Sequence, residues 1–394
     1  MSPSPELVLV ANARLPSERA QSLQVLQAAC AFARSGARTT LLHARRTHTP
    51  ELPAGIDLFA HYEVPAGPRA EVVAVPCRDF IDAVPRALQY LPARLQELSF
   101  ARAAARRVAA AHARAWCLSR ELECARELVR RGRENVFLEL HRVPGGRTRR
   151  AWLAEALEGC AGVFAISGGV AADLRPFDLD PDRIEVAHDG FEASRFADLP
   201  SRAEARGRLG LAADRRVVVY TGGLLAWKGV EVLVAAAREL PDALVVIAGG
   251  MPADVERIRG AAAGLENVRV DGFQPPAAVR DYLAAADVGV VPNRSEPAIS
   301  ARYTSPLKVF EAMACGLPLV ASDLPSLREL LTDEVDALLV APDDPAALAA
   351  GLRRLLDDED LRAALGERLR GRAGEHTWDA RAARMLRWMG RRAA

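Results

Sequence analysis

Short apolar runs alternate with amphipathic segments along this chain, and the alternation constrains its fold more than any other feature. Residues 7–10 form the first apolar run. A loop and an amphipathic stretch from 18 to 35 follow it, Gly36 ends that stretch, and a second strand-like run covers 38–42. A strand, loop, helix, turn and strand in succession form the unit from which parallel sheets are built. The beginning of the chain therefore predicts an α/β domain.

The first half of the chain also contains a long Arg-rich region. Further buried strands are predicted on either side of it, at 72–75, 136–140, 163–166 and 184–187. Residues 85–133 show helical periodicity, and from Val84 to Arg150 there are 15 Arg against 6 acidic residues, a local excess of +9. A solvated helix face is the simpler explanation of this excess, and peripheral contact with an anionic membrane surface or a phosphorylated acceptor is the alternative.

A second alternating series begins near Arg215. Strands are predicted at 217–220, 243–248, 268–270, 288–291, 319–321 and 338–340, with helices between them. This pattern is typical of a doubly wound parallel sheet. We therefore expect two Rossmann-like domains, residues 1–195 and 215–375, joined by a polar linker at 196–214. The helical tail at 376–394 is expected to pack on the first domain, and ligands to bind between the carboxyl ends of both sheets.

Two loops of the second series have the composition of anion-binding turns. The first runs from Tyr220 to Gly229 and contains Gly222, Gly223 and Lys228 between a strand and a helix. Glycines allow backbone N–H groups to approach an anion closely, and Lys supplies a point charge for phosphate. Lys228 is one of only two lysines in a chain with 52 basic Lys and Arg residues. An ordinary tight turn is the alternative interpretation of this loop.

The second loop, 303–322, contains the other lysine, Lys308. Ser305 and Pro306 are expected to be the N-cap and first residue of a helix, so that the amides near Leu307 and Lys308 face a bound diphosphate. Glu311 lies just beyond the first turn, where a carboxylate can accept the two hydroxyls of a ribose. A Glu near a helix start is otherwise a common partner of the helix dipole.

The two loops together resemble the donor-binding half of the family 4 retaining glycosyltransferases, which have the GT-B fold. The residues that carry the resemblance are G-x-L-x-x-x-K-G, from Gly222, and S-P-L-K-x-x-E-x-M-A-x-G-x-P-x-V-A-S, from Ser305. Weaker N-terminal similarity lies in the loop 12–18, in Glu139-Leu140-His141, at 165–167 and in the segment 188–196. The resemblance covers nearly the whole chain.

The resemblance implies a role for each matched residue. Lys228 would bind the donor diphosphate and Glu311 the ribose, while Phe273 and Gln274 would contact the base. His141 would lie at the sugar, close to the attacking acceptor. The implied donor contacts are Gly222, Gly223, Lys228, Phe273, Gln274, Ser305, Pro306, Leu307, Lys308 and Glu311. The implied acceptor-side residues are Asn12, Pro16, Ser17, Glu139 and His141.

Two positions depart from the family pattern. Many members have Arg where this chain has Gly223, so one phosphate-binding cation is absent, and Lys308 or Arg302 is expected to replace it. The first Glu of the family's E-x7-E pattern is Tyr303 here, which leaves the identity of the sugar open. The S-P-L-K form nevertheless resembles one branch of the family.

Composition and isolated motifs argue against several other classes of protein. A net charge of +1 argues against a nucleic-acid binder. No apolar run is long enough to span a bilayer, no signal peptide is expected at the N-terminus, and six scattered cysteines are typical of a reducing cytoplasm. Asp178-Leu179-Asp180 is interpreted as a turn, and His43 and His48 have no third ligand at a plausible spacing, so no metal site is predicted.

The leading hypothesis is a metal-independent glycosyltransferase without a cofactor. It would move a sugar from a UDP-, GDP-, ADP- or dTDP-sugar to a hydroxyl acceptor, either lipid-linked or a small metabolite. The family mechanism is a same-face attack in which the leaving phosphate helps to deprotonate the acceptor, so that no carboxylate pair is needed. A GT-B nucleotide-sugar epimerase and a non-catalytic sugar-nucleotide binding module remain the alternatives.

Overall fold

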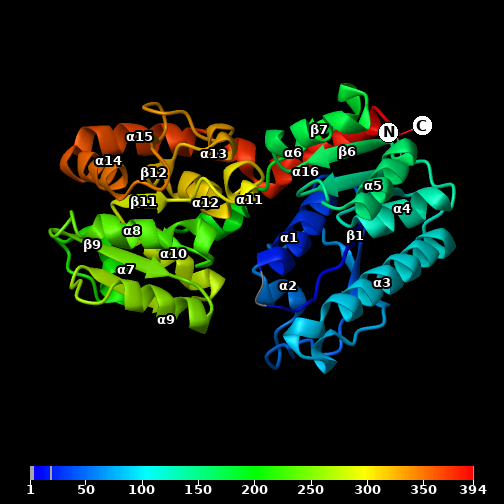
Figure 1. Ribbon diagram of the computed structural model, residues 1–394, viewed down its shortest axis with the longest axis horizontal. Helices are drawn as coiled ribbons and strands as arrows, with labels where there is room; N and C mark the ends of the chain where they lie inside the picture. Colours follow the sequence, from blue (N-terminus) through cyan, green and yellow to red (C-terminus); the bar gives the residue numbers. More distant parts are fainter. Residues whose placement is uncertain (1–3, 18–19, 394) are drawn as a thin grey trace. The chain divides into compact units, whose positions relative to one another are not determined.

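The computed structural model describes residues 4–17 and 20–393, which fall into two compact units (Figure 1). Unit 1 contains the chain up to residue 166, residues 170–188 and the C-terminal segment from Trp378. Unit 2 contains residues 167–169 and 189–377. The segment 196–214, expected to be a linker, lies inside unit 2 instead. There Arg206 of helix α7 (Arg202–Leu209) donates a hydrogen bond to Asp287 at 2.9 Å, and this buried pair fixes the segment to the unit.

Unit 1 is built on a seven-stranded parallel sheet with the order β3-β2-β1-β4-β5-β6-β7. Its strands are β1 (Glu6–Ala11), β2 (Arg38–Arg45), β3 (Glu71–Pro76), β4 (Trp116–Ser119), β5 (Val136–Leu140), β6 (Gly162–Ala165) and β7 (Ile184–Val186). Strand β4 was missed by the sequence analysis, because its four residues lie between two strongly helical, Arg-rich segments. Beyond β1 the strand order changes direction, so the carboxyl ends of β1 and β4 flank a topological switch point.

The helices of unit 1 include the last helix of the chain. They are α1 (Ala20–Arg34), α2 (Leu58–His61), α3 (Tyr90–Ala111), α4 (Leu122–Arg130), α5 (Arg147–Gly159), α6 (Gly168–Asp173), which crosses the boundary to unit 2, and α16 (Trp378–Gly390). Trp378 at the start of α16 donates its indole N–H to Gln27 of α1 at 3.0 Å. Near the other end of α16, the Trp388 ring lies 4.9 Å from that of Phe164. The tail therefore packs on the α/β sheet of the first half.

Unit 2 has a six-stranded parallel sheet with the order β10-β9-β8-β11-β12-β13. Its strands are β8 (Arg216–Thr221), β9 (Ala243–Ala248), β10 (Val268–Gly272), β11 (Val288–Val291), β12 (Leu319–Ser322) and β13 (Leu338–Val340). All six correspond to predicted strands. Two doubly wound parallel sheets confirm the predicted fold class.

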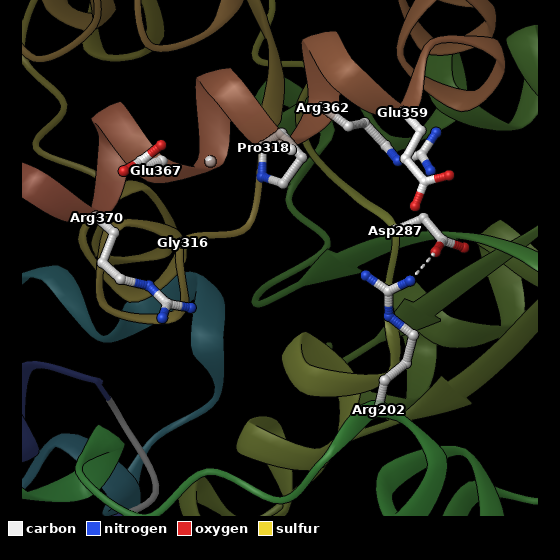
Figure 2. Close-up of a pocket in the computed structure, with 10 residues that line it drawn as sticks. Arg202, Asp287, Gly316, Pro318, Glu359, Arg362, Glu367 and Arg370 are labelled. Atoms are coloured by element: carbon white, nitrogen blue, oxygen red, sulfur yellow. Dashed lines mark ion pairs between the residues drawn. The ribbon is translucent and has the colours of Figure 1, made fainter.

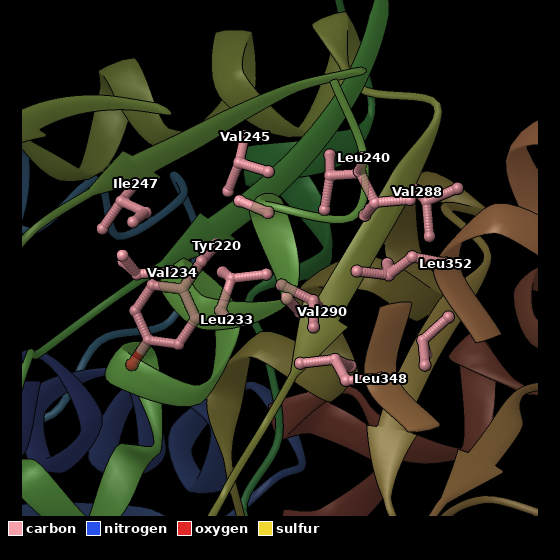
Figure 3. Packing of buried hydrophobic residues seen from close by; sticks show 14 of the residues in the cluster. Tyr220, Leu233, Val234, Leu240, Val245, Ile247, Val288, Val290, Leu348 and Leu352 are labelled. Carbon is pink, nitrogen blue, oxygen red and sulfur yellow. The ribbon is translucent and has the colours of Figure 1, made fainter. Parts of the chain in front are cut away.

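Helices cover both faces of this sheet, as the alternating side chains of strand β8 show. Val218 and Tyr220 point into one core with helices α8 (Val230–Ala237) and α14 (Pro345–Asp357), which Figure 3 shows. Val217 and Val219 point into the opposite core, with α10 (Pro276–Ala285) and α12 (Leu307–Cys315). A strand buried on both faces is a continuous apolar run, as the sequence indicates. The remaining helices of unit 2 are α9 (Pro252–Ala261), α11 (Ala298–Ala301), α13 (Pro325–Arg328) and α15 (Glu359–Gly371).

Candidate functional site

Two loops meet closely at the carboxyl ends of β8 and β9. Gly222 donates its N–H to the carbonyl of Ala248 at 2.9 Å and has a φ of +124°. A Cβ added to Gly249 would lie 2.2 Å from the Gly222 carbonyl oxygen. Glycine at these positions therefore lets the backbones approach and leaves the edge of the sheet open to a ligand.

Lys228 ends a short 3₁₀ turn at residues 226–228, just before α8 begins. Gly229 follows it with a φ of +70°, and a Cβ there would lie 1.8 Å from the Pro292 carbonyl oxygen, so this position requires glycine. The Lys228 ammonium lies 4.0 Å from the centroid of the Trp227 ring. Burial lowers the pKa of Lys228 to about 8, because desolvation disfavours the charged form.

Lys308 brings the second loop to the first. Its ammonium lies 3.5 Å from the centroid of the Tyr220 ring. A Cβ on Gly222 would be 3.7 Å from both Nζ and Cε of Lys308. Within residues 4–17 and 20–393 the buried Nζ has no hydrogen-bond partner. Burial, and secondly the charge of Lys228, lower the pKa of Lys308 well below its usual value. Two neighbouring amines that form no ion pair within the described residues are suited to an anion.

Helix α12 begins one residue later than predicted. Pro306 occupies the N-cap position and Leu307 is the first helical residue, so the expectation that Ser305 caps the helix was wrong. The hydroxyl of Ser305 instead accepts a hydrogen bond from the Asp189 N–H at 2.8 Å. The first bond of the helix runs from the Val309 N–H to the Pro306 carbonyl at 3.0 Å. The amides of Leu307 and Lys308 therefore precede the hydrogen-bonded ladder, at the positive end of the helix.

Glu311 lies one turn after Lys308, on the same side of α12. Burial raises the pKa of Glu311, and the charges of Arg195 and Lys308 oppose this rise. Arg195 is held in place by a hydrogen bond to the Pro276 carbonyl at 2.8 Å. The structure thus brings Lys228, Lys308 and Glu311 into one electrostatically coupled group. The segment with Arg195 was noted only through its resemblance, and no local pattern predicts the effect of its charge on Glu311.

The remaining predicted donor contacts lie in loops at the same end of the sheet. Phe273, directly after β10, is 53% exposed. Gln274 beside it donates to the Asp271 carbonyl at 3.2 Å. The carbonyl of Gly223 accepts a hydrogen bond from the Tyr220 hydroxyl at 2.6 Å. In the described part of the chain no atom lies within 4 Å of a Cβ built on Gly223, so a larger side chain would fit there.

In unit 1, Asn12 lies beyond the end of β1 beside the end of β4. Its N–H donates to Glu121 Oε1 at 3.1 Å, and its side chain exchanges two hydrogen bonds with Gln96, at 2.9 and 2.8 Å. The pairing of Val10 with Ser119 places these residues side by side. Burial raises the pKa of Glu121 to about 7. The sequence analysis did not identify Glu121, because its neighbour in space is distant in sequence.

The other residues of this predicted acceptor loop are Pro16 and Ser17. The Leu15–Pro16 peptide bond is cis. The Ser17 N–H donates to the hydroxyl of Tyr62 at 2.7 Å, and this hydroxyl donates to the Ser17 carbonyl at 2.8 Å. Glu18, the last residue of the quoted loop, lies outside the described residues. The loop is therefore fixed to the segment that contains Tyr62.

Glu139 and His141, at the end of β5, belong to a network of paired charges. Glu139 is buried and contacts Arg381 NH2 at 2.9 Å and Arg120 Nε at 3.0 Å. These arginines keep the pKa of Glu139 well below its usual value, although burial opposes them. His141 Nε2 lies 3.0 Å from Glu139 Oε1 and 2.8 Å from Arg120 NH2. The side chain of Glu139 is thus occupied within the protein, while that of His141 is 39% exposed.

A separate pocket of about 320 Å³ lies at the amino ends of β11 and β12, opposite to the two lysine loops (Figure 2). Asp287 immediately precedes β11, and it forms an ion pair with Arg202 at 3.0 Å. The charged residues of the lining are Arg202, Arg362, Arg370, Asp287, Glu359 and Glu367. Positive and negative side chains are equal in number, so this pocket has no net charge with which to select a phosphate.

Among the residues that the structure describes, no three His, Cys, Asp or Glu side chains are grouped so that they could hold a metal ion. No described helix is both long enough and apolar enough to cross a bilayer.

Known proteins resemble the second half of this chain in sequence. Residues 215–358 match the family model described as glycosyl transferases group 1. A D-inositol 3-phosphate glycosyltransferase of Xylanimonas cellulosilytica is 36% identical over 231 residues, which are 55% of this chain and 53% of that protein. The chain thus spans about half the length of the curated relatives it matches.

Solved structures cover the chain more completely. Sucrose-phosphate synthase from Thermosynechococcus elongatus has a TM-score of 0.74 at 22% identity and covers 98% of both chains. Anabaena HepE in complex with UDP-glucose has a TM-score of 0.71 at 18% identity and covers 97% of this chain and 99% of its own. The chain therefore has the GT-B fold of these proteins, and its segment 215–358 matches the glycosyl transferases group 1.

Proposed function

We propose that this protein is a glycosyltransferase that moves a sugar from a nucleoside diphosphate sugar to a hydroxyl acceptor. The observation that carries the proposal is the group formed by Lys228, Lys308 and Glu311 at the carboxyl end of the second sheet. Two neighbouring ammonium groups suit a diphosphate, and a carboxylate one helical turn after Lys308 suits a ribose. The match of residues 215–358 to a glycosyltransferase family supports the same function.

The reaction needs a stabilised leaving group, and the chain has suitable residues for it. Lys228, Lys308 and the first amides of α12 would neutralise the departing diphosphate without a metal ion or a cofactor. Lys308 would supply the positive charge that many family members have at the position of Gly223. The leaving phosphate would then help to deprotonate the acceptor on the same face of the sugar, with retention of configuration, as the resemblance to the S-P-L-K branch of family 4 implies.

The acceptor is proposed to bind unit 1, near His141 and the loop that contains Asn12, Pro16 and Ser17. The exposed ring of His141 would contact the sugar, while Glu139 would hold this ring in place. The names of the relatives make D-inositol 3-phosphate a natural first acceptor to assay. A lipid-linked acceptor and a small metabolite remain within the proposal.

The proposal also includes the location of the protein in the cell. The chain would act in the cytoplasm, with peripheral membrane contact through the Arg-rich region 84–150. Arg106 and Arg107 are exposed on α3 and are the best placed to test it. Replacing both with Glu should reduce sedimentation with anionic vesicles and leave the signal with neutral vesicles unchanged. Equal sedimentation of both proteins would remove the membrane from the proposal.

A screen for donor binding and transfer tests the central proposal. Thermal shift with UDP-, GDP-, ADP- and dTDP-sugars identifies the nucleotide, and product analysis with D-inositol 3-phosphate or other polyols identifies transfer. We expect stabilisation by one nucleotide class and acceptor-dependent release of the diphosphate, with an α-linked product from an α-linked donor. Stabilisation without turnover would favour the binding module, and a change of sugar configuration without an acceptor would favour the epimerase.

A further inference from the structure

Asn293, two residues after the end of β11, has a buried side chain whose polar atoms are unused. The residue is 0% exposed, and in the described chain neither Oδ1 nor Nδ2 has a hydrogen-bond partner. A carboxamide offers two donors and one acceptor, and buried groups of this kind are almost always paired. The exception calls for a bound partner that the protein itself does not provide.

Asn267 shows how the same unit treats a structural asparagine. It is 8% exposed and donates Nδ2 to the carbonyls of Ala237, Leu240 and Ala243, at 2.9, 2.9 and 3.3 Å. These hydrogen bonds connect the turn before β9 to the residue that precedes β10. Asn293 has the same side chain and is more deeply buried, but its amide forms no hydrogen bond within the described residues.

The position of Asn293 is fixed against the loop of Lys228. Before it, the Pro292 carbonyl fills the place where Gly229 would have a Cβ. After it, the Arg294 N–H donates to the Trp227 carbonyl at 3.0 Å. The amide is therefore held between two backbone contacts to the loop that carries the first lysine. Lys308 Nζ, the other buried group without a partner in this part of unit 2, lies against the same loop.

The strand order indicates which part of a donor the amide would meet. The expected base contacts, Phe273 and Gln274, follow β10, and the Lys228 loop follows β8. Asn293 follows β11, which lies beyond β8 on the side away from β10. A donor with its base near β10 and its diphosphate at Lys228 would extend its sugar toward β11.

We infer that Asn293 binds hydroxyl groups of the donor sugar and helps to select that sugar, an inference that rests on the proposed function. A hydroxyl both donates and accepts, so sugar hydroxyls satisfy Nδ2 and Oδ1 together. A phosphate only accepts, and it would leave Oδ1 unsatisfied. The amide thereby distinguishes donor sugars by the arrangement of their hydroxyl groups.

The experiment compares UDP with UDP-glucose on three variants, Asn293→Leu, Asn293→Ala and the control Asn267→Leu. Calorimetry should show UDP-glucose affinity at least tenfold lower in both Asn293 variants, equivalent to about 1.4 kcal/mol. UDP affinity should stay within twofold of wild type. Without ligand, Asn293→Leu should raise Tm because it removes an unsatisfied buried amide, whereas Asn267→Leu should lower Tm because it leaves three carbonyls without their donor.

Each other outcome contradicts the inference in a distinct way. Unchanged UDP-glucose affinity in Asn293→Ala shows that the sugar does not contact the amide. Equal losses for UDP and UDP-glucose assign the amide to the nucleotide instead. A lower Tm or failed folding of Asn293→Leu shows that the free protein already satisfies the amide through buried water. A wild-type protein that binds no UDP, GDP, ADP or dTDP sugar contradicts the proposed function itself, and the inference with it.

Discussion

The charged side chains at the carboxyl ends of the two sheets differ in whether they form ion pairs. In unit 2, the half-buried Lys228 and Lys308 form no ion pair among the described residues, and each has its pKa lowered by burial. In unit 1, Glu139 is more deeply buried but is paired with Arg120 and Arg381. An unpaired buried charge is costly to the free protein, whereas a paired one is part of its framework. The comparison separates residues available to a ligand from residues that hold others in place.

The largest effect is expected from breaking the framework of unit 1. Arg381→Met leaves the buried Glu139 with one arginine fewer, and we expect a loss of about 3 kcal/mol in the free energy of unfolding. Urea denaturation followed by Trp fluorescence measures it, because four of the five tryptophans lie in unit 1. The control Arg216→Met removes an exposed pair with Asp357 and should cost less than 1 kcal/mol. Equal losses in the two variants would show that the buried network stabilises the protein no more than an exposed ion pair does.

The same contrast explains what the sequence could predict. The first lysine loop is local: Gly222, Lys228 and Gly229 lie within eight residues, so this short segment alone predicts an anion-binding turn. The network around Glu139 joins β5 to a helix 242 positions later. No local pattern could connect Arg381 to it. His141 was identified only through resemblance, and its partner Arg120 not at all.

Two errors in the predicted secondary structure also have local causes. Strand β4 has four residues and is flanked by helix-forming Ala and Arg, so periodicity over a longer window hid it. The start of α12 was misplaced by one residue because both Ser305 and Pro306 are common at helix starts. The hydroxyl of Ser305 is taken by the Asp189 N–H, a contact over 116 positions that no capping rule anticipates.

The next prediction tests whether the lysines of unit 2 behave as ligand groups. Lys308→Met removes a buried ammonium without a partner in the described structure, so the Tm of the free protein should rise. UDP affinity should fall by about 1.5–3 kcal/mol, since a charge-assisted contact is lost. Thermal shift and calorimetry measure the two effects, with the exposed Arg238→Met as the control. A fall in Tm together with unchanged UDP affinity would make Lys308 a structural residue.

A smaller loss of affinity is expected when Glu311 is replaced, and it tests whether this residue binds the ribose. Glu311→Gln keeps the size of the side chain but loses one acceptor for the ribose hydroxyls, and we expect about 1–2 kcal/mol less affinity for UDP. The variant should also lose the preference for UDP over 2′-deoxy-UDP, which the wild type is expected to show. Glu256→Gln, an exposed change on α9, serves as the control. If the preference survives in Glu311→Gln, the ribose lies elsewhere.

The smallest effect is the pH dependence that the buried lysine imposes on donor binding. Burial lowers the pKa of Lys228 to about 8, and the proposed function has its charged form bind the diphosphate. Raising the pH through 8 removes this proton, so the affinity for UDP-glucose should fall, by at most tenfold between pH 7 and 9. UDP-glucose is the suitable ligand because its diphosphate diester does not titrate in this range. Lys228→Arg stays charged up to pH 9 and should flatten the change near pH 8. An identical pH profile in that variant would mean that the titrating group is not Lys228, and the unpaired charge in unit 2 would then have to be sought at another residue.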